Sequence, residues 1–147
     1  MTVCAEASMA IDAAPSQVYE LLADYEVSHP QILPHNFFTG IHVVSGGHGA
    51  GTVLDVGTRQ FGRQVIYRTV VTEPEPGRVL VESDQQGSFV TTFTVDAADS
   101  GGSLVRIATE WKDLRGLLSR WLTPIAARAI YQRQLEMIAS KVRRGTA

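Results

Sequence analysis

The chain of 147 residues has a single cysteine, Cys4, and no hydrophobic run long enough to cross a membrane. One cysteine excludes an internal disulfide and any metal centre built from several cysteines. A membrane-spanning helix needs about 20 consecutive apolar residues, and no segment reaches that length. No hydrophobic leader follows the first methionine. We therefore expect a cytoplasmic protein, with Cys4 as a small residue within a strand.

The chain also has no large excess of charge of one sign, because it contains 13 lysines and arginines and 15 aspartates and glutamates. The basic residues are scattered, apart from a short group near the C-terminus that suits the end of a helix. Proteins that bind nucleic acid usually gather basic side chains on one face. The sequence therefore predicts no nucleic-acid partner, and it leaves the oligomeric state open. Length and composition fit one domain over residues 1–147.

The four histidines, His29, His35, His42 and His48, do not form a metal-binding pattern. They make no helical pair four residues apart, and no carboxylate motif joins them. His29 and His35 flank prolines in a segment that we expect at the surface. The glycine-rich run 46–51 lacks the lysine of a phosphate-binding loop. The sequence thus predicts no metal and no cofactor.

The chain does contain a long series of short apolar runs separated by turns rich in glycine, proline and aspartate. Alternation within these runs predicts strands. The predicted strands cover residues 2–11, 38–45, 52–56, 63–72, 78–83, 88–96 and 104–111. Tight turns between successive strands favour an antiparallel sheet. Grouped strands with helices near both ends favour an α+β fold.

Helical segments follow the first strand. Pro15 suits the first turn of a helix, because its missing N–H has no partner there. The buried stripe of this helix would consist of Val18, Leu21, Leu22 and Tyr25. Pro30 and Pro34 limit residues 28–36 to a short second helix or a helical turn.

A long amphipathic helix is predicted from Asp113 to Arg144. Its apolar residues recur at helical spacing: Leu114, Leu117, Leu118, Trp121, Leu122, Ile125, Ala129, Leu135, Ile138 and Val142. Pro124 predicts a bend inside this helix, either a fixed kink or the hinge of a lid. A helix of this length needs a concave partner, which a curved sheet can supply. A hollow between sheet and helix would suit a small molecule.

Alternation assigns one face of each later strand to the interior. In residues 63–72 both faces are mixed, and we place Tyr67 inside because this leaves Arg68 in water; a one-residue bulge would reverse that choice. In residues 78–83 we expect Leu80 and Glu82 to face solvent. The inward set is Val65, Tyr67, Thr69, Val71, Val79, Val81, Ser83, Phe89, Thr91, Phe93, Val95, Val105, Ile107, Thr109 and Trp111.

This inward set mixes aromatic rings with hydroxyl groups, as ligand pockets do. Threonine is also common in strands, so the pattern leaves a cavity and plain core packing as open alternatives. If a cavity exists, we expect it to be lined by Tyr67, Thr69, Phe89, Thr91, Phe93, Ile107, Thr109, Trp111, Trp121 and Ile125.

An enzyme with this interior would need an acid or base and a donor for a developing enolate. The candidates are Tyr67, Asp55, Arg59 and Glu110, with His35 at an entrance. No pairing of acid and base is visible in the sequence. Catalytic residues therefore stay unknown, and Tyr67 is the candidate that faces the interior.

Three features of the chain together resemble the START/polyketide-cyclase-like superfamily, also called SRPBCC. The first is the stretch Ile11 to Asp24, in which a strand leads through Ala14-Pro15 into a helix. The second is the turn 73–78, Glu-Pro-Glu-Pro-Gly-Arg, between central strands. The third is the C-terminal helix with its internal Pro124. Together these features span nearly the whole chain, in the order in which the family has them.

The resemblance implies the helix-grip fold, an α+β architecture. In it a curved seven-stranded antiparallel sheet surrounds a long C-terminal helix, with two short helices after the first strand. It also implies an internal pocket for an apolar molecule such as a lipid, sterol or polyketide. The activity is not implied, because members include lipid carriers, aromatase/cyclases, hormone receptors and partners of ribosomes or chaperones.

We therefore predict that the protein binds a small hydrophobic ligand such as a lipid or polyketide. Transport of this ligand is compatible with the same prediction. One alternative is a polyketide cyclase/aromatase, of the cyclase/dehydrase type. The other is a protein-interaction module, toxin-like or ribosome-associated. Whether any reaction is catalysed is left open by the sequence.

Overall fold

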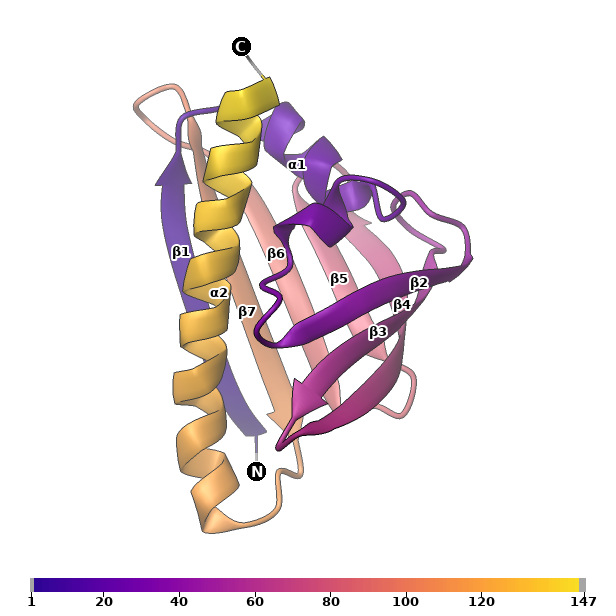
Figure 1. Ribbon diagram of the computed structural model, residues 1–147. Coiled ribbons are helices and arrows are strands. Elements are labelled where there is room, and N and C mark those ends of the chain that lie inside the picture. Colours follow the sequence, from indigo (N-terminus) through magenta and orange to yellow (C-terminus); the bar gives the residue numbers. More distant parts are fainter. Residues whose placement is uncertain (1, 146–147) are drawn as a thin grey trace.

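The computed structural model describes residues 2–145, in which one antiparallel sheet curves around a long helix (Figure 1). The strands are β1 (Thr2–Ile11), β2 (Phe38–Ser45), β3 (Val53–Gln60), β4 (Arg63–Glu75), β5 (Val79–Asp84), β6 (Phe89–Ala97) and β7 (Ser103–Lys112). The helices are α1 (Pro15–Ala23), the short 3-10 helix η1 (His29–Ile32) and α2 (Leu117–Gly145). The predicted α+β helix-grip fold is confirmed.

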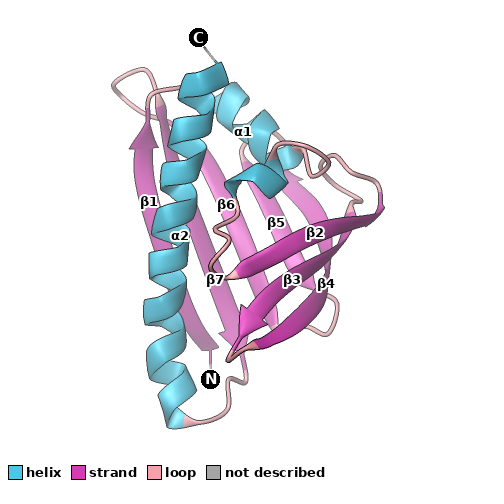
Figure 2. Cartoon of the chain, viewed as in Figure 1, coloured by secondary structure: helices cyan, strands magenta, loops and turns pink. Residues whose placement is uncertain are grey.

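The strand order β1-β7-β6-β5-β4-β3-β2 places the first strand beside the last. From β2 onward each strand pairs antiparallel with the next, as the tight turns predict. β1 then joins the edge at β7, with Thr2 opposite Lys112 and Ile11 opposite Ser103. In Figure 2, β2 and β3 run obliquely to β6 and β7, and α1 lies near the C-terminal end of α2.

The solid core includes the predicted stripe of α1 and the C-terminal half of α2. Val18 and Leu22 of α1 and Leu135 and Ile138 of α2 are all 0% exposed and belong to one cluster. Burial of such a side chain stabilises the fold by about 1.5–3 kcal/mol. Leu21 and Tyr25 are buried as well, so the stripe predicted for α1 is confirmed.

Strand β5 faces the opposite way from the prediction. Leu80 is fully buried and Glu82 lines the interior, whereas Val79, Val81 and Ser83 lie half-buried on the other face. The prediction placed the charged residue in water. In the structure Glu82 points inward because side chains of the α1–β2 segment supply it with partners. Alternation within one strand cannot reveal partners that come from elsewhere in the chain.

Helix α2 begins at Leu117, not at Asp113. Asp113 and Gly116 have positive φ angles of 57° and 86°, which keep residues 113–116 in a loop. The helix then continues through Pro124 without interruption. Among the described residues, no helix is both long and apolar enough to cross a membrane.

The predicted apolar stripe of α2 holds only in the C-terminal half of the helix. Trp121 and Ile125 are 68% and 59% exposed. They stand six and two residues before the buried Ala127, and at about 100° per residue this turns both away from the sheet. The buried face of α2 is instead formed by Ala127, Tyr131, Gln134, Leu135, Ile138 and Val142. The side chains of Leu117 and Leu118 lie outside the described part.

Candidate functional site

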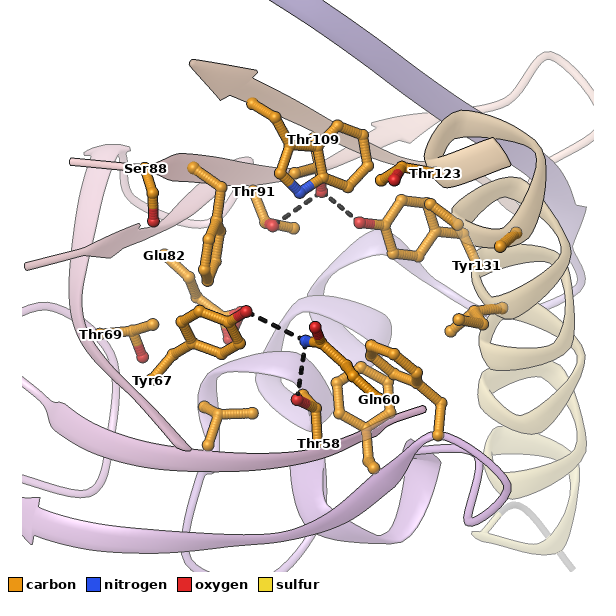
Figure 3. Close-up of a pocket in the computed structure, with 18 of the residues that line it drawn as sticks. Thr58, Gln60, Tyr67, Thr69, Glu82, Ser88, Thr91, Thr109, Thr123 and Tyr131 are labelled. Carbon is orange, nitrogen blue, oxygen red and sulfur yellow. Dashed lines mark hydrogen bonds between the residues drawn. The ribbon is translucent and has the colours of Figure 1, made fainter. Parts of the chain in front are cut away.

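A cavity of about 540 Å³ lies between the N-terminal half of α2 and the concave face of the sheet. This volume is in the range of sites for drug-sized ligands, about 300–1,000 Å³. Apolar side chains from the segment 33–41, from β3 and from α2 form much of its wall, among them Leu33, Phe37, Phe38, Ile41, Val56 and Ile130. Figure 3 shows the polar groups that face this space.

The part of the sheet that faces this cavity is arranged in rows, because inward residues of neighbouring strands stand opposite one another. The innermost row is apolar and fully or almost fully buried, and of its members Leu80, Phe93 and Ile107 it is Phe93 that reaches the cavity. The next row is polar: Glu82, Thr91 and Thr109. The outermost row is aromatic: Phe89 and Trp111. A ligand lying along the strands would therefore meet polar groups between two apolar zones.

One hydroxyl cluster joins the sheet to the helix. Thr91 Oγ1 and Thr109 Oγ1 are 2.8 Å apart, and Thr109 Oγ1 also bonds the hydroxyl of Tyr131 on α2 (Figure 3). Burial raises the pKa of Tyr131 to about 12, so this hydroxyl stays protonated at neutral pH. The cluster offers neutral oxygen and hydrogen-bond donors to a ligand, and no charge.

A second polar cluster lies on the β3–β4 side. Gln60 Nε2 donates to the Tyr67 hydroxyl at 3.0 Å and to Thr58 Oγ1 at 3.1 Å. The ring of Tyr67 packs edge-on against Phe89, with ring centroids 5.1 Å apart. Since the Tyr67 oxygen accepts from Gln60, its own proton can be donated elsewhere. Tyr67 can therefore offer a hydrogen bond to an oxygen in the cavity.

A buried carboxyl and imidazole form the third polar group. Glu82 Oε1 accepts a hydrogen bond from the Tyr25 hydroxyl at 3.2 Å and lies 3.7 Å from His29 Nε2. Burial raises the pKa of the Glu82 carboxyl above its ordinary value, and the nearby imidazole opposes that rise. His29 is 1% exposed, which corrects the expectation of a surface position. Its ring stacks on Tyr25, with centroids 4.5 Å apart.

Thr69 differs from the other hydroxyl residues of the wall. It is 2% exposed, and its Oγ1 is the one buried side-chain oxygen or nitrogen in the described residues that has no hydrogen-bond partner. Leaving a buried hydroxyl unpaired costs about 1–3 kcal/mol. Thr69 lines the cavity through the rest of its side chain, because the hydroxyl oxygen itself has almost no accessible surface.

Most of the predicted lining residues do face the cavity: Tyr67, Thr69, Phe89, Thr91, Phe93, Thr109 and Trp111. Ile107 belongs to the core beyond the cavity, and Trp121 and Ile125 lie on the outer side of α2. Whether the lining residues contact a ligand stays a prediction.

The structure separates the candidate acids and bases. Asp55 is paired with Arg68 on the outer surface, through bonds of 2.8 and 2.9 Å. Glu110 and His35 are exposed, and Arg59 lines the cavity. None of these brings an acid and a base together in the described part of the cavity.

The sequence reasoning missed Glu82, His29, Tyr25, Gln60 and Tyr131. One signal was available, because a glutamate between apolar residues of a strand can face inward if a partner exists. The partners lie 53 to 57 positions away, at His29 and Tyr25, and their four-residue spacing gives no hint of a distant carboxylate. Gln60 and Tyr131 carry no recognisable pattern at all.

The fold and the site together define a helix-grip protein with a cavity suited to an apolar ligand. A family described as polyketide cyclase / dehydrase and lipid transport matches residues 2–143. Because the match covers nearly the whole chain, the protein belongs to this family. The predicted relationship to START/polyketide-cyclase-like proteins is thereby confirmed. No curated protein matches the chain.

Solved structures show the same fold. The KanY protein is 28% identical, with a TM-score of 0.84 over 97% of this chain and 99% of that one. A START superfamily protein from Mycobacterium smegmatis is 14% identical, with a TM-score of 0.76 over 97% and 98%. A protein of Thermus thermophilus is 19% identical, with a TM-score of 0.77 over 98% and 99%. At such identities the latter two support the fold alone.

Proposed function

We propose that this protein binds a small apolar molecule carrying several oxygen atoms, such as a polyketide or an oxygenated lipid. The observation that carries this proposal is a cavity of about 540 Å³ whose apolar wall is interrupted by separate polar clusters. Hydrogen-bonding groups inside an apolar pocket fix the orientation of a ligand, whereas its apolar surface supplies most of the affinity. Family membership supports hydrophobic-ligand binding in general.

The spacing of the polar groups supports an oxygenated ligand over a plain hydrocarbon. The Thr91–Thr109–Tyr131 cluster and the Tyr67 hydroxyl come from different parts of the wall. A hydrocarbon would displace water from these groups without replacing its hydrogen bonds, which lowers affinity. A ligand with oxygens along its length would pair with several of these groups.

The test is binding of N-phenyl-1-naphthylamine, a neutral apolar dye that becomes fluorescent in dry pockets, to matched variants of α2. Ile130 lines the cavity, whereas Ile125 on the same helix is 59% exposed and lies outside it. Ile130→Trp should fill part of the cavity and weaken dye binding at least tenfold. Ile125→Trp should leave dye binding unchanged. Equal effects of the two substitutions, or no binding by the unaltered protein, would refute the proposal.

Native mass spectrometry of the purified protein extends the test to the natural ligand. A bound species that is retained by Ile125→Trp and lost in Ile130→Trp would identify the ligand by mass. If neither dye nor co-purified ligand is found and a macromolecule is captured instead, the interaction-module alternative is favoured.

A polyketide cyclase or dehydrase is the second candidate. One observation favours it, namely that Glu82, a carboxyl with a raised pKa, faces the same cavity as several hydroxyl donors. Groups whose pKa is shifted by burial and by a specific partner are frequent in active sites. Turnover of a poly-β-ketone that Glu82→Gln abolishes would support this candidate.

A further inference from the structure

Four large apolar side chains are exposed near the mouth of the cavity. Phe61 at the tip of the β3–β4 hairpin is completely exposed, and Trp121, Leu122 and Ile125 on α2 are each more than half exposed. Phe61 and Leu122 also line the cavity, so they stand at its opening. Figure 2 shows the β3–β4 hairpin and the first turns of α2 at the same end of the molecule, away from α1. Exposed apolar residues that gather in one place mark an interaction site, whereas isolated ones do not.

The exposed residues of α2 form one stripe along the helix. At about 100° per residue, Trp121, Leu122 and Ile125 all lie within about 100° of one another around the axis. Ala127 and Tyr131, on the other side, are buried against the rest of the protein. The first half of α2 is therefore apolar on its outer side as well, and packing within the described residues leaves that side open.

The turn at the hairpin tip does not account for Phe61. Phe61 and Gly62 have φ angles of 51° and 77°, and a two-residue hairpin turn with two positive φ angles strongly favours asparagine followed by glycine. A bulky aromatic residue is strained in this conformation. Because its side chain is also fully exposed, phenylalanine neither suits the turn nor contributes to the core. A contact outside the chain would explain its presence.

Basic side chains surround these apolar residues. Residues 56–72 and 114–135, which carry the hairpin tip and the first half of α2, contain no aspartate or glutamate. Exposed cations at this end are Arg59, Arg63, Lys112, Arg115 and Arg128, and none of them forms an ion pair with any described residue. The sequence scatters these residues, and the fold brings them together.

The arginines elsewhere on the sheet behave differently. Arg68, Arg78 and Arg106 each pair with a carboxylate on the outer surface. Asp113 is the one exposed acidic side chain among the described residues that line the cavity. The mouth is thus positive on a chain whose net charge is −2. This contrast calls for a negatively charged partner at the mouth.

We propose that the mouth docks on a membrane surface that contains anionic phospholipids. The docking surface consists of the β3–β4 hairpin tip, the loop 113–116 and the outer side of α2 as far as Arg128. Aromatic and leucine side chains enter the boundary between headgroups and acyl chains, while arginines bind phosphates. The apolar residues protrude from separate elements, and a fluid lipid surface accommodates such protrusions without a matching groove.

This inference goes beyond the proposed function, because docking does not require a molecule in the cavity. It also accounts for the outward position of Trp121 and Ile125, which helix packing leaves unexplained. In the docked orientation the cavity mouth would face the bilayer.

Co-sedimentation with vesicles tests the electrostatic part. The protein should bind vesicles of an equal mixture of phosphatidylglycerol and phosphatidylcholine at low ionic strength, and should bind pure phosphatidylcholine much more weakly. The double variant Arg59→Gln/Arg115→Gln should weaken binding about 25-fold, since each basic residue near an anionic surface contributes about fivefold. Arg68→Gln/Arg106→Gln changes the net charge equally on the outer face of the sheet and should leave binding nearly unchanged.

Phe61→Asn tests the apolar part without damaging the fold. Asparagine suits the turn, so the variant should unfold at an equal or higher temperature than the unaltered protein. It should nevertheless bind the anionic vesicles about tenfold more weakly, because the inserted ring is lost. Val27→Asn is the matched control, since Val27 is another exposed apolar loop residue and does not line the cavity. It should bind as the unaltered protein does.

Tryptophan fluorescence reports the orientation. Trp111 and Trp121 are the two tryptophans of the chain, so Trp111→Phe leaves Trp121 as the probe. On anionic vesicles its emission should shift to shorter wavelength and be quenched by phospholipids with brominated acyl chains. Val27→Trp in a Trp111→Phe/Trp121→Phe background should show neither change.

The outcomes separate this inference from the proposed function. No binding to anionic vesicles, equal binding to neutral ones, or quenching at position 27 as strong as at Trp121 would overturn it. Binding that the arginine substitutions weaken and Phe61→Asn does not would indicate an acidic protein partner, and would overturn the lipid assignment. Ile130→Trp should still dock, and its failure to do so would show that lipid inside the cavity carries the binding. If vesicles bind and N-phenyl-1-naphthylamine does not, docking stands and the proposed function fails.

Discussion

Two tyrosine–glutamate pairs in this protein have opposite electrostatic character. Tyr19 donates to Glu73 Oε1 at 2.6 Å, and the backbone N–H of Ala50 donates to Glu73 Oε2 at 2.8 Å. The hydrogen bond from Tyr19, followed by that from Ala50, lowers the pKa of Glu73 below its ordinary value. Tyr25 donates to Glu82 at 3.2 Å, and there burial dominates and raises the pKa.

The comparison shows that the number of hydrogen-bond donors, and not the presence of a tyrosine partner, determines the role of a partly buried glutamate. That role is either to stabilise the fold or to remain able to bind a ligand. Glu73 has donors on both oxygens and ties helix α1 and the loop at Ala50 to strand β4. Glu82 has a long bond on one oxygen and the cavity beside it. A carboxylate with complete partners stabilises the fold, whereas one short of partners keeps capacity for a ligand.

The largest contrast should appear when each carboxyl is altered. Glu73→Ala removes the acceptor for both Tyr19 and Ala50, and should lower the free energy of unfolding by about 2–3 kcal/mol. Glu82→Gln removes a buried group that is disfavoured as a charge, and should leave stability unchanged or higher. Urea denaturation at pH 7 measures both. A greater loss for Glu82→Gln than for Glu73→Ala would reverse the comparison.

The tyrosines should follow the same order with smaller effects. Tyr19→Phe removes a short bond to a charged acceptor, which is worth about 1.5–3 kcal/mol. Tyr25→Phe removes a longer bond and should cost about 1 kcal/mol. Equal losses, measured by urea denaturation of the two variants, would show that bond length and acceptor charge do not explain the difference.

Two buried threonines, Thr52 just before β3 and Thr69 in the cavity wall, provide a third comparison of stability effects. Thr52 Oγ1 accepts from the backbone N–H of Gly47 at 3.1 Å and is fully buried, so Thr52→Val should cost about 1–3 kcal/mol by leaving that N–H unpaired. Thr69 Oγ1 has no partner, so Thr69→Val should be neutral or stabilising by up to about 1 kcal/mol. Thermal unfolding of both variants compares them, and a destabilised Thr69→Val would mean that its hydroxyl is already satisfied.

The pH dependence of stability should differ in sign between the two glutamates. Glu73 binds its proton less tightly when folded, so its contribution is present above its ordinary pKa of 4.5 and is lost as pH falls through the lowered folded value. Glu82 binds its proton more tightly when folded, so its contribution is full below 4.5 and is lost as pH rises through the raised value.

Glu73→Gln should therefore become less harmful in acid, and Glu82→Gln should become relatively more stable as the pH rises toward 7. Urea denaturation at several pH values reports both trends. Parallel trends for the two variants would contradict the opposite pKa shifts.

The fold could be predicted from the sequence because its helices, strands and turns are indicated by patterns of nearby residues. The proline at position 15, the turns between strands and the alternation of residues 89–95 all act within a few residues, and each matches the structure. The candidate site was predicted only where alternation reached it, as at Tyr67 and Thr109. Glu82 was assigned to the wrong face because its inward position depends on His29 and Tyr25, which only the tertiary fold brings near.

Trp121 and Ile125 illustrate a second limit. Helical periodicity gives the spacing of an apolar stripe, but not which side of the helix the sheet will cover when two stripes compete. Near the cavity α2 faces the sheet with Ala127 and Tyr131, and the larger side chains at 121 and 125 point outward. Because Ala127 is small, it leaves space in the cavity that a tryptophan facing the sheet would fill.

The pairing of β1 with β7 has a consequence for how the protein is made. The first strand can complete the sheet only after the chain as far as Lys112 has been synthesised, so its edge partner is missing until β7 has been made. Closing so long a loop is entropically costly and slows folding. Until then β1 is an unpaired strand on the nascent polypeptide, open to chaperones or to mispairing with other chains.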